Sequence, residues 1–340
     1  MMPAAAIRNL LLRRLLQLLL MAWAIGTITF VLVRSLPGDM AYRIAAERYG
    51  DDAITTAAAA SVRQELGLDV PAWQHYLNWL LELVQLNLGN SLVSGDPVIH
   101  NLQHQLSYTL ALVFAGLLVS LLLAIPIGLL AGFKANRGAD HLSLLASTLI
   151  RAQPVFSVGL LLIFLLAMNI QWLPVAGFGE LKHLILPALT LGICMAAVSS
   201  RIIRNSTVDV TRSAYYQFAR VKGLSRWHTF VHHGVRNISV PVVAYLGIQT
   251  VMLIEGVIMI ESLFAWPGIG HALSHAIFSR DVPMIQGAAL LMGMLFVVIN
   301  ALVDAICLWL DPRLQLSAST SNNASPTNST GKKTAQEASL

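Results

Sequence analysis

Long apolar runs separated by polar segments dominate the chain. A helix needs about 20 predominantly apolar residues to cross the hydrocarbon layer of a bilayer. Six runs have about this length or more: 15–33, 108–133, 142–170, 184–203, 239–264 and 284–308. The third is interrupted by Arg151-Ala152-Gln153-Pro154, where either a tilted span breaks or an interfacial helix leads into a span that begins near Pro154. The pattern predicts an all-α polytopic membrane protein with six transmembrane helices.

The composition agrees with this prediction. Of the 340 residues, 56% are hydrophobic and 11% are charged, whereas an ordinary soluble domain carries roughly 25% charged residues. The net charge of +5 comes from bases in short loops beside apolar runs, so membrane topology explains it better than nucleic-acid binding does. Cys194 and Cys307 both lie in apolar runs, so no disulfide framework is expected.

The distribution of charge predicts an orientation. The long polar region from 34 to 107 holds eight acidic residues against four arginines, as expected of an exported segment. Six crossings then place fifteen Lys and Arg residues and both termini in the cytoplasm, and six bases outside, with Arg151 unassigned. We predict three parts: residues 1–107, the first span plus a periplasmic region between the first two spans; 108–313, five further helices; and 314–340, a disordered cytoplasmic tail rich in Ser, Thr and Asn.

A basic loop, residues 213–236, separates the fourth and fifth predicted spans. Ser213 can cap a short helix, and Gly223 stands where a left-handed C-terminal glycine is wanted. Ser225 can start a second short helix that runs through Val235, and Pro241 can open the next apolar run. A loop that only fixes the orientation of the chain would also account for the basic charges.

This loop resembles the EAA loop of bacterial ABC-importer permeases, in the dipeptide, oligopeptide and nickel branch. The resemblance rests on Ala219-Arg220-x-Lys222-Gly223-Leu224, His233-x-x-Arg236-Asn237 and Pro241. The usual acidic first residue is absent, with Tyr216 or Gln217 near its place. The resemblance implies a coupling helix that lies in a groove of a cytoplasmic ATPase, and small Ala219 and Gly223 would allow close docking. The expected coupling residues are Tyr216, Ala219, Arg220, Lys222, Gly223, Leu224 and Arg236.

Further matches to the same branch extend over most of the chain. In the exported region they are Leu36-Pro37-Gly38-Asp39, Leu66-Gly67-Leu68-Asp69 and Leu88-Gly89-x-Ser91. Near the outer end of the fifth and sixth spans they suggest a periplasmic gate, at Trp266, Pro267, Gly268, Gly270 and Asp281. The resemblance implies a multi-pass protein of the bacterial inner membrane. Its implied partners are a second, related permease subunit, two cytoplasmic ABC ATPase subunits and a periplasmic substrate-binding protein.

Catalytic motifs are missing. The sequence has no GxxxxGK[ST] phosphate loop, no HExxH helix and no GxSxG elbow. We therefore expect a non-catalytic transport subunit that binds no cofactor, with ATP hydrolysis in the partner ATPase. An ion-gradient-driven secondary transporter or channel, using Glu255 and Asp304 as relays, is the alternative, and it leaves the basic loop without a task.

Ionisable residues inside spans are costly and therefore mark candidate functional positions. Glu255 and Glu261 are the candidates for the translocation pathway. Glu255 can line it or pair with a partner subunit, whereas Glu261 suits a structural role at the outer mouth better than substrate contact. His271 and His275 form an i,i+4 pair, as do His100 and His104, but two histidines make no firm metal site. An outer aromatic belt is expected at Trp73, Trp79, Trp172 and Trp266. Within the branch we expect nickel, free or chelated, with short peptides close behind.

Overall fold

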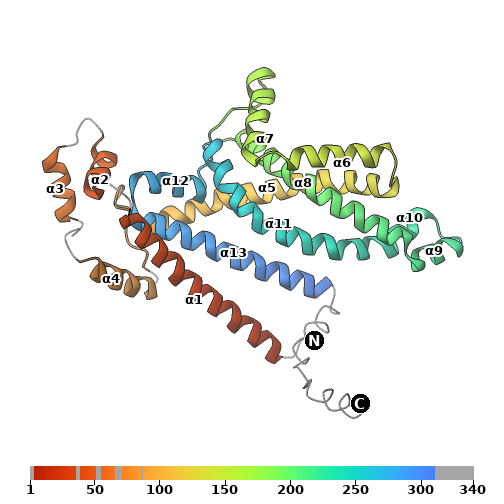
Figure 1. Ribbon diagram of the computed structural model, residues 1–340, viewed down its shortest axis with the longest axis horizontal. Coiled ribbons are helices and arrows are strands. Elements are labelled where there is room, and N and C mark those ends of the chain that lie inside the picture. Colours follow the sequence, from red (N-terminus) through yellow and green to blue (C-terminus); the bar gives the residue numbers. More distant parts are fainter. Residues whose placement is uncertain (1–3, 36–38, 51–54, 66–70, 86, 311–340) are drawn as a thin grey trace, which may run out of the picture.

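The computed structural model is an elongated bundle of helices (Figure 1). It describes residues 4–35, 39–50, 55–65, 71–85 and 87–310, except for some helical side chains, those of Glu255 and Asp304 among them. The expected tail, the Leu66-Gly67-Leu68-Asp69 motif and all of the Leu36-Pro37-Gly38-Asp39 motif except Asp39 lie outside these residues. In chain order the elements are α1 (Ala4–Ser35), α2 (Met40–Tyr49), α3 (Thr56–Glu65), α4 (Ala72–Val84), α5 (Val98–Phe133), α6 (Gly138–Arg151), α7 (Val155–Leu162), the π-helix η2 (Ile163–Asn169), α8 (Leu181–Arg212), α9 (Ala214–Val221), α10 (Arg226–Thr229), the π-turn η3 (Phe230–Gly234), α11 (Val235–Leu263), α12 (Ile269–Ser279) and α13 (Val282–Leu310).

The described residues contain helices but no strand, apart from one isolated bridge between Asn90 and Pro97. Four described segments are long and apolar enough to cross a membrane: Arg14–Leu32, Val98–Phe133, Leu181–Arg212 and Val282–Val303. The bent pair formed by α6 with α7 and η2 raises this number to five. The prediction of an all-helical polytopic membrane protein is confirmed at this level, and the sixth crossing, through α11, stays a prediction.

The interruption expected near Pro154 is present. Helices α6 and α7 meet at an angle of 103°. Pro154 occupies the N-cap of α7, and a proline there has no N–H to continue α6 and disfavours a helical residue before it. Pro126, Pro187 and Pro241, in contrast, lie inside α5, α8 and α11.

A ladder of small residues joins α5 to α8. Along α5 every fourth residue is small and buried: Gly116, Ser120, Ala124, Gly128 and Gly132. A Cβ atom at Gly128 would lie 2.7 Å from the Ser200 carbonyl oxygen and from the Ile203 Cβ of α8. Without a side chain at this position the two backbones approach closely, which is how helices associate inside a membrane, where burial of apolar surface gives no advantage.

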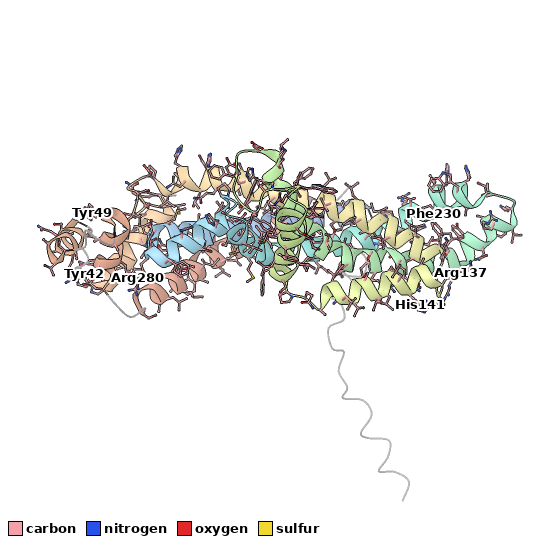
Figure 2. The ribbon with its side chains drawn as sticks, turned by 90° about the horizontal axis from the view of Figure 1, so that it is seen from above. Tyr42, Tyr49, Arg137, His141, Phe230 and Arg280 are labelled. Atoms are coloured by element: carbon pink, nitrogen blue, oxygen red, sulfur yellow. The ribbon has the colours of Figure 1, made fainter. Side chains whose placement is uncertain are left out.

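The two ends of the bundle are built from different parts of the chain. Figure 1 shows α2, α3, α4 and α12 at one end, and α9 and α10 at the opposite end. In Figure 2, Tyr42, Tyr49 and Arg280 lie toward the first end, and Phe230, Arg137 and His141 toward the second. The described helices of the acidic 34–107 region that precede α5 and the basic 213–236 loop therefore lie at opposite ends of the helical bundle.

Candidate functional site

The basic loop contains the turn that its sequence predicts. Gly223 has φ +88°, which glycine adopts without strain. Its N–H donates to the Arg220 carbonyl at 3.0 Å, and the Leu224 N–H donates to the Ala219 carbonyl at 3.3 Å. These two bonds form a Schellman motif, so helix α9 ends at the predicted glycine.

Of the two helix N-caps predicted on either side of this turn, the structure contains one. The Ser225 hydroxyl accepts from the His228 N–H at 3.2 Å, as expected of an N-cap. Ser213 occupies the N-cap position of α9, but its hydroxyl donates to the Val210 carbonyl at 2.6 Å and caps nothing in α9. The side-chain cap predicted at Ser213 is therefore wrong.

The second helix does not stop at Val235. Helix α10 continues through the π-turn η3 into α11, and Pro241 lies inside α11 instead of opening it. Phe230 and Ile238 are buried in one cluster with Val210 and Tyr216. The continuous helix places both side chains in this cluster, and their burial offsets the hydrogen bond that Pro241 cannot donate.

The face of α9 that is open to a partner differs from the expected one. Ala219 and Tyr216 are buried within the loop, so Ala219 presents no small side chain for docking. Val221, 85% exposed, Trp227, 72% exposed, and Phe218, 60% exposed, are the most exposed of the large apolar side chains of the loop. A helix end with projecting apolar side chains suits insertion into a partner's groove.

The remaining expected coupling residues lie around this face. Lys222 and Arg236 are exposed, and Lys222 Nζ stands 4.7 Å above the Phe218 ring. The Arg220 guanidinium donates to the Leu224 carbonyl at 2.6 Å, closing the turn. A cavity of about 530 Å³ opens beside the loop, lined by Phe133, Thr211, Tyr216, Gln217, Arg220, Trp227 and Phe230.

An ionic cluster that the sequence did not reveal joins α6 to α8 near the same end. Asp140, buried in the first turn of α6, accepts from Arg201 Nη1 at 3.1 Å and from Arg204 Nε at 3.0 Å. Its second oxygen accepts from the Asn136 N–H at 2.9 Å and pairs with Arg204. Since acid and bases lie some sixty residues apart, sequence spacing alone offered no signal for this contact.

At the opposite end, Glu261 caps a helix. Its side chain is 0% exposed. One carboxylate oxygen accepts from the Thr109 hydroxyl at 2.6 Å, and the other accepts from the N–H groups of Gly270 and His271 at 2.7 and 3.3 Å. Thr109 also accepts from the Ile269 N–H at 2.9 Å. The first three N–H groups of α12 are thereby satisfied, and the negative carboxylate favours the positive end of the helix dipole.

This geometry corrects the placement of Glu261 in the translocation pathway. The carboxylate is enclosed by the chain itself, so in this conformation it lines no open passage. Gly268 belongs to the same arrangement, because a Cβ atom there would lie 2.0 Å from Glu261 Oε1. The side chain of Glu255, the other pathway candidate, lies outside the described residues.

Trp266 is part of the packed outer end and not of an interfacial belt. It is buried, its indole N–H donates to the Tyr108 carbonyl at 3.0 Å, and the two rings meet edge to face at 5.6 Å. The prediction of a belt position is wrong for this tryptophan. Trp73 and Trp172 are exposed, as a belt requires.

Asp281 connects two of the sequence motifs. One carboxylate oxygen accepts from the Leu92 N–H at 3.1 Å and the Met284 N–H at 3.3 Å, and the other accepts from the Ser91 hydroxyl. Ser91 closes the Leu88-Gly89-x-Ser91 motif, and Asp281 directly precedes α13. The segment around Ser91 is thus fastened to the end of the bundle at the start of the last described helix.

A recess of about 400 Å³ lies beside these contacts. His104 of α5 and His271 and His275 of α12 all line it. The ring centroids of His271 and His275 are 4.6 Å apart. Burial and the neighbouring His275 lower the pKa of His271. Within the described part of the chain, no group of three or more His, Cys, Asp or Glu side chains could hold a metal ion. The recess is lined by Ser91, Val93, Ser94, Asn101, His104, Gln105, Pro267, Gly268, His271, Ala272, His275, Ala276, Ser279, Asp281 and Met284.

Known proteins resemble the chain over most of its length. Residues 124–316 match the family model of the binding-protein-dependent transport system inner membrane component, and residues 7–113 match the model of its N-terminal part. The glutathione transport system permease protein GsiC of Escherichia coli O6:H1 (strain CFT073) is 35% identical over 307 residues, 90% of this chain and 99% of that protein. The proteins of the same name from E. coli K12 and Salmonella typhimurium LT2 are 34% identical over the same shares.

Proposed function

Because the chain belongs to the inner-membrane components of binding-protein-dependent transport systems, we propose that it forms half of the translocation pathway of an ATP-driven importer. As a member of this family it is a multi-pass permease subunit of an ABC importer, and the permeases of such importers are not themselves catalytic. The observation that carries the proposal is similarity over 90% of the chain, which includes both ends of the bundle.

The 213–236 loop receives the motion of the ATPase in this proposal. Its exposed Phe218, Val221 and Trp227 enter a groove of a cytoplasmic ATPase subunit, and Lys222 and Arg236 add positive charge at the rim. The loop and both termini are cytoplasmic, the 34–107 region and α12 lie at the periplasmic end of the bundle, and α11 completes six crossings. A second permease subunit, a second ATPase and a periplasmic binding protein complete the transporter.

The recess at the periplasmic end faces the incoming substrate. We assign short peptides as the preferred cargo, because the relatives are named glutathione permeases and glutathione is a tripeptide. Nickel, free or chelated, is the second candidate, since His271 and His275 lack a third protein ligand among the described residues.

Uptake by the complete transporter in proteoliposomes tests the proposal. With the binding protein present and ATP inside the vesicles, labelled glutathione or a labelled dipeptide should accumulate, and omission of ATP should abolish uptake. Accumulation of nickel but not of peptide would reverse the order of the substrates. Uptake that persists on an ion gradient without ATP would overturn the ABC mechanism in favour of a secondary transporter or channel.

A further inference from the structure

Helix α4 lies in the exported region, yet one face is packed against the first span. The Tyr76 hydroxyl lies 2.8 Å from Thr27 Oγ1, and the Tyr76 ring meets the Phe30 ring with centroids 5.4 Å apart. Trp79 covers Gly26 so closely that a Cβ atom there would lie 1.9 Å from the indole ring. Figure 1 likewise shows α4 beside the end of α1. These contacts fix where α4 sits along α1.

At that position α4 lies beside a part of α1 that belongs to its candidate membrane span. Gly26 lies within the candidate span Arg14–Leu32, and at a rise of about 1.5 Å per residue it is roughly 9 Å from the outer end of that span. On the same part of α1 the side chains of Ile28, Val31 and Leu32 are exposed. Helix α4 therefore lies at the depth where α1 itself faces hydrocarbon.

A second face of α4 carries large apolar side chains that are exposed. Trp73, Leu77 and Leu81 recur every fourth residue and are 62%, 47% and 61% exposed. A helix turns about 100° per residue, so these three form one stripe beside the face that meets α1. Gln74, Asn78 and Glu82 form a parallel, exposed polar stripe one residue further on. The helix is thus amphipathic around its free surface.

We propose that α4 is a membrane-embedded amphipathic helix of the outer leaflet, with its Trp73–Leu77–Leu81 stripe in contact with lipid acyl chains. The polar Gln74–Asn78–Glu82 stripe faces the aqueous side. Lipid is the occupant because the stripe lies at the level of Ile28, Val31 and Leu32 of α1, whose apolar side chains are exposed as well. Trp73, at the first turn of α4, suits the interface between headgroups and hydrocarbon. The inference rests on the proposed function only in placing α1 across the membrane.

Spin labels on the two stripes provide the test. In the complete transporter, with Cys194 and Cys307 replaced by Ser, single labels are attached to the variants Leu77→Cys, Leu81→Cys, Asn78→Cys and Glu82→Cys. The samples are placed in nanodiscs of phosphatidylethanolamine and phosphatidylglycerol. At 77 and 81, collisions with oxygen should exceed those with a water-soluble nickel chelate, and at 78 and 82 the order should reverse.

Two outcomes would overturn the proposal. Free access of the nickel chelate to 77 and 81 would place the stripe in water, and protection of these positions from both reagents would mean that a protein subunit covers it. ATP-dependent uptake by the same labelled variants, reconstituted in proteoliposomes, reports on the transporter separately. A failure of α4 to contact lipid is therefore distinguishable from a failure of the proposed function.

Discussion

Glu261 shows how a single buried side chain holds together the α12 end of the bundle. Three donors from α5 and α12 converge on its carboxylate, and Gly268 leaves the space that the carboxylate fills. A charged group is stable in such a place only when its oxygens are hydrogen-bonded. The residue therefore acts by positioning α12 against α5 and α11.

Replacement of this carboxylate should destabilise the protein. In Glu261→Ala the Thr109 hydroxyl and the two N–H groups of α12 lose their acceptor, at a cost of about 1–3 kcal/mol for each buried donor left unpaired. Thermal unfolding of the detergent-solubilised protein should show a clear fall in Tm. Glu180→Ala is the matched control, because Glu180 is exposed and its side chain caps no helix. Equal Tm values for the two variants would contradict the capping role.

At the scale of elements, the pairing of α5 with α8 depends on close backbone approach. Matched Gly→Ala changes separate this effect from helix propensity. Gly128→Ala forces a Cβ atom against α8 and should destabilise the protein by about 1–3 kcal/mol, typical of overpacking. Gly138→Ala meets no atom within 4 Å and should leave Tm unchanged or slightly higher. If both variants have the same Tm, the close contact at Gly128 does not determine the stability of the protein.

The contact of α6 with α8 depends on Asp140. In Asp140→Asn the partly buried side chains of Arg201 and Arg204 lose their anionic partner, and removal of one member of a fully buried ion pair costs about 3–5 kcal/mol. The partial exposure of both arginines reduces that cost. Tm should fall more than in Asp96→Asn, whose side chain is exposed. A Tm as high as that of this control would show that the ion pairs contribute nothing.

At the scale of the whole molecule, the proposed function requires that a signal pass from the α9–α10 end to the recess at the far end. Val221→Asp places a charge on the exposed apolar tip of the 213–236 loop. We expect it to abolish ATP-dependent uptake while expression and Tm stay close to those of the wild type. Val175→Asp, which adds the same charge at another exposed valine, is the control and should transport normally.

A variant at the buried Ala219 serves as a comparison for Val221→Asp. Because Ala219 is buried within the loop, Ala219→Arg should lower Tm as well as uptake, unlike Val221→Asp. Size-exclusion profiles and Tm of the two variants distinguish a lost docking surface from a damaged loop. Normal uptake by Val221→Asp would contradict the docking face that the structure indicates.

The features that follow from local sequence were predicted well. Apolar length marked the candidate spans, Pro154 marked the break between α6 and α7, and Gly223 marked the end of α9. Each depends on a physical property of a short segment: its apolar length relative to the thickness of the hydrocarbon layer, the missing N–H of proline, or the freedom of glycine to adopt positive φ. The family resemblance added an expected role for the 213–236 loop, docking on an ATPase, which stays a prediction.

What local sequence left undecided is which side chains meet across the bundle. The hydrogen bond between Thr109 and Glu261 joins residues 152 positions apart, and Ser91 binds Asp281 from 190 positions away. Helical periodicity places a residue on a face, but the neighbour of that face follows from how all the helices pack. For that reason the capping role of Glu261, the buried state of Ala219 and Trp266, and the anchor at Asp140 were decided only by the tertiary structure.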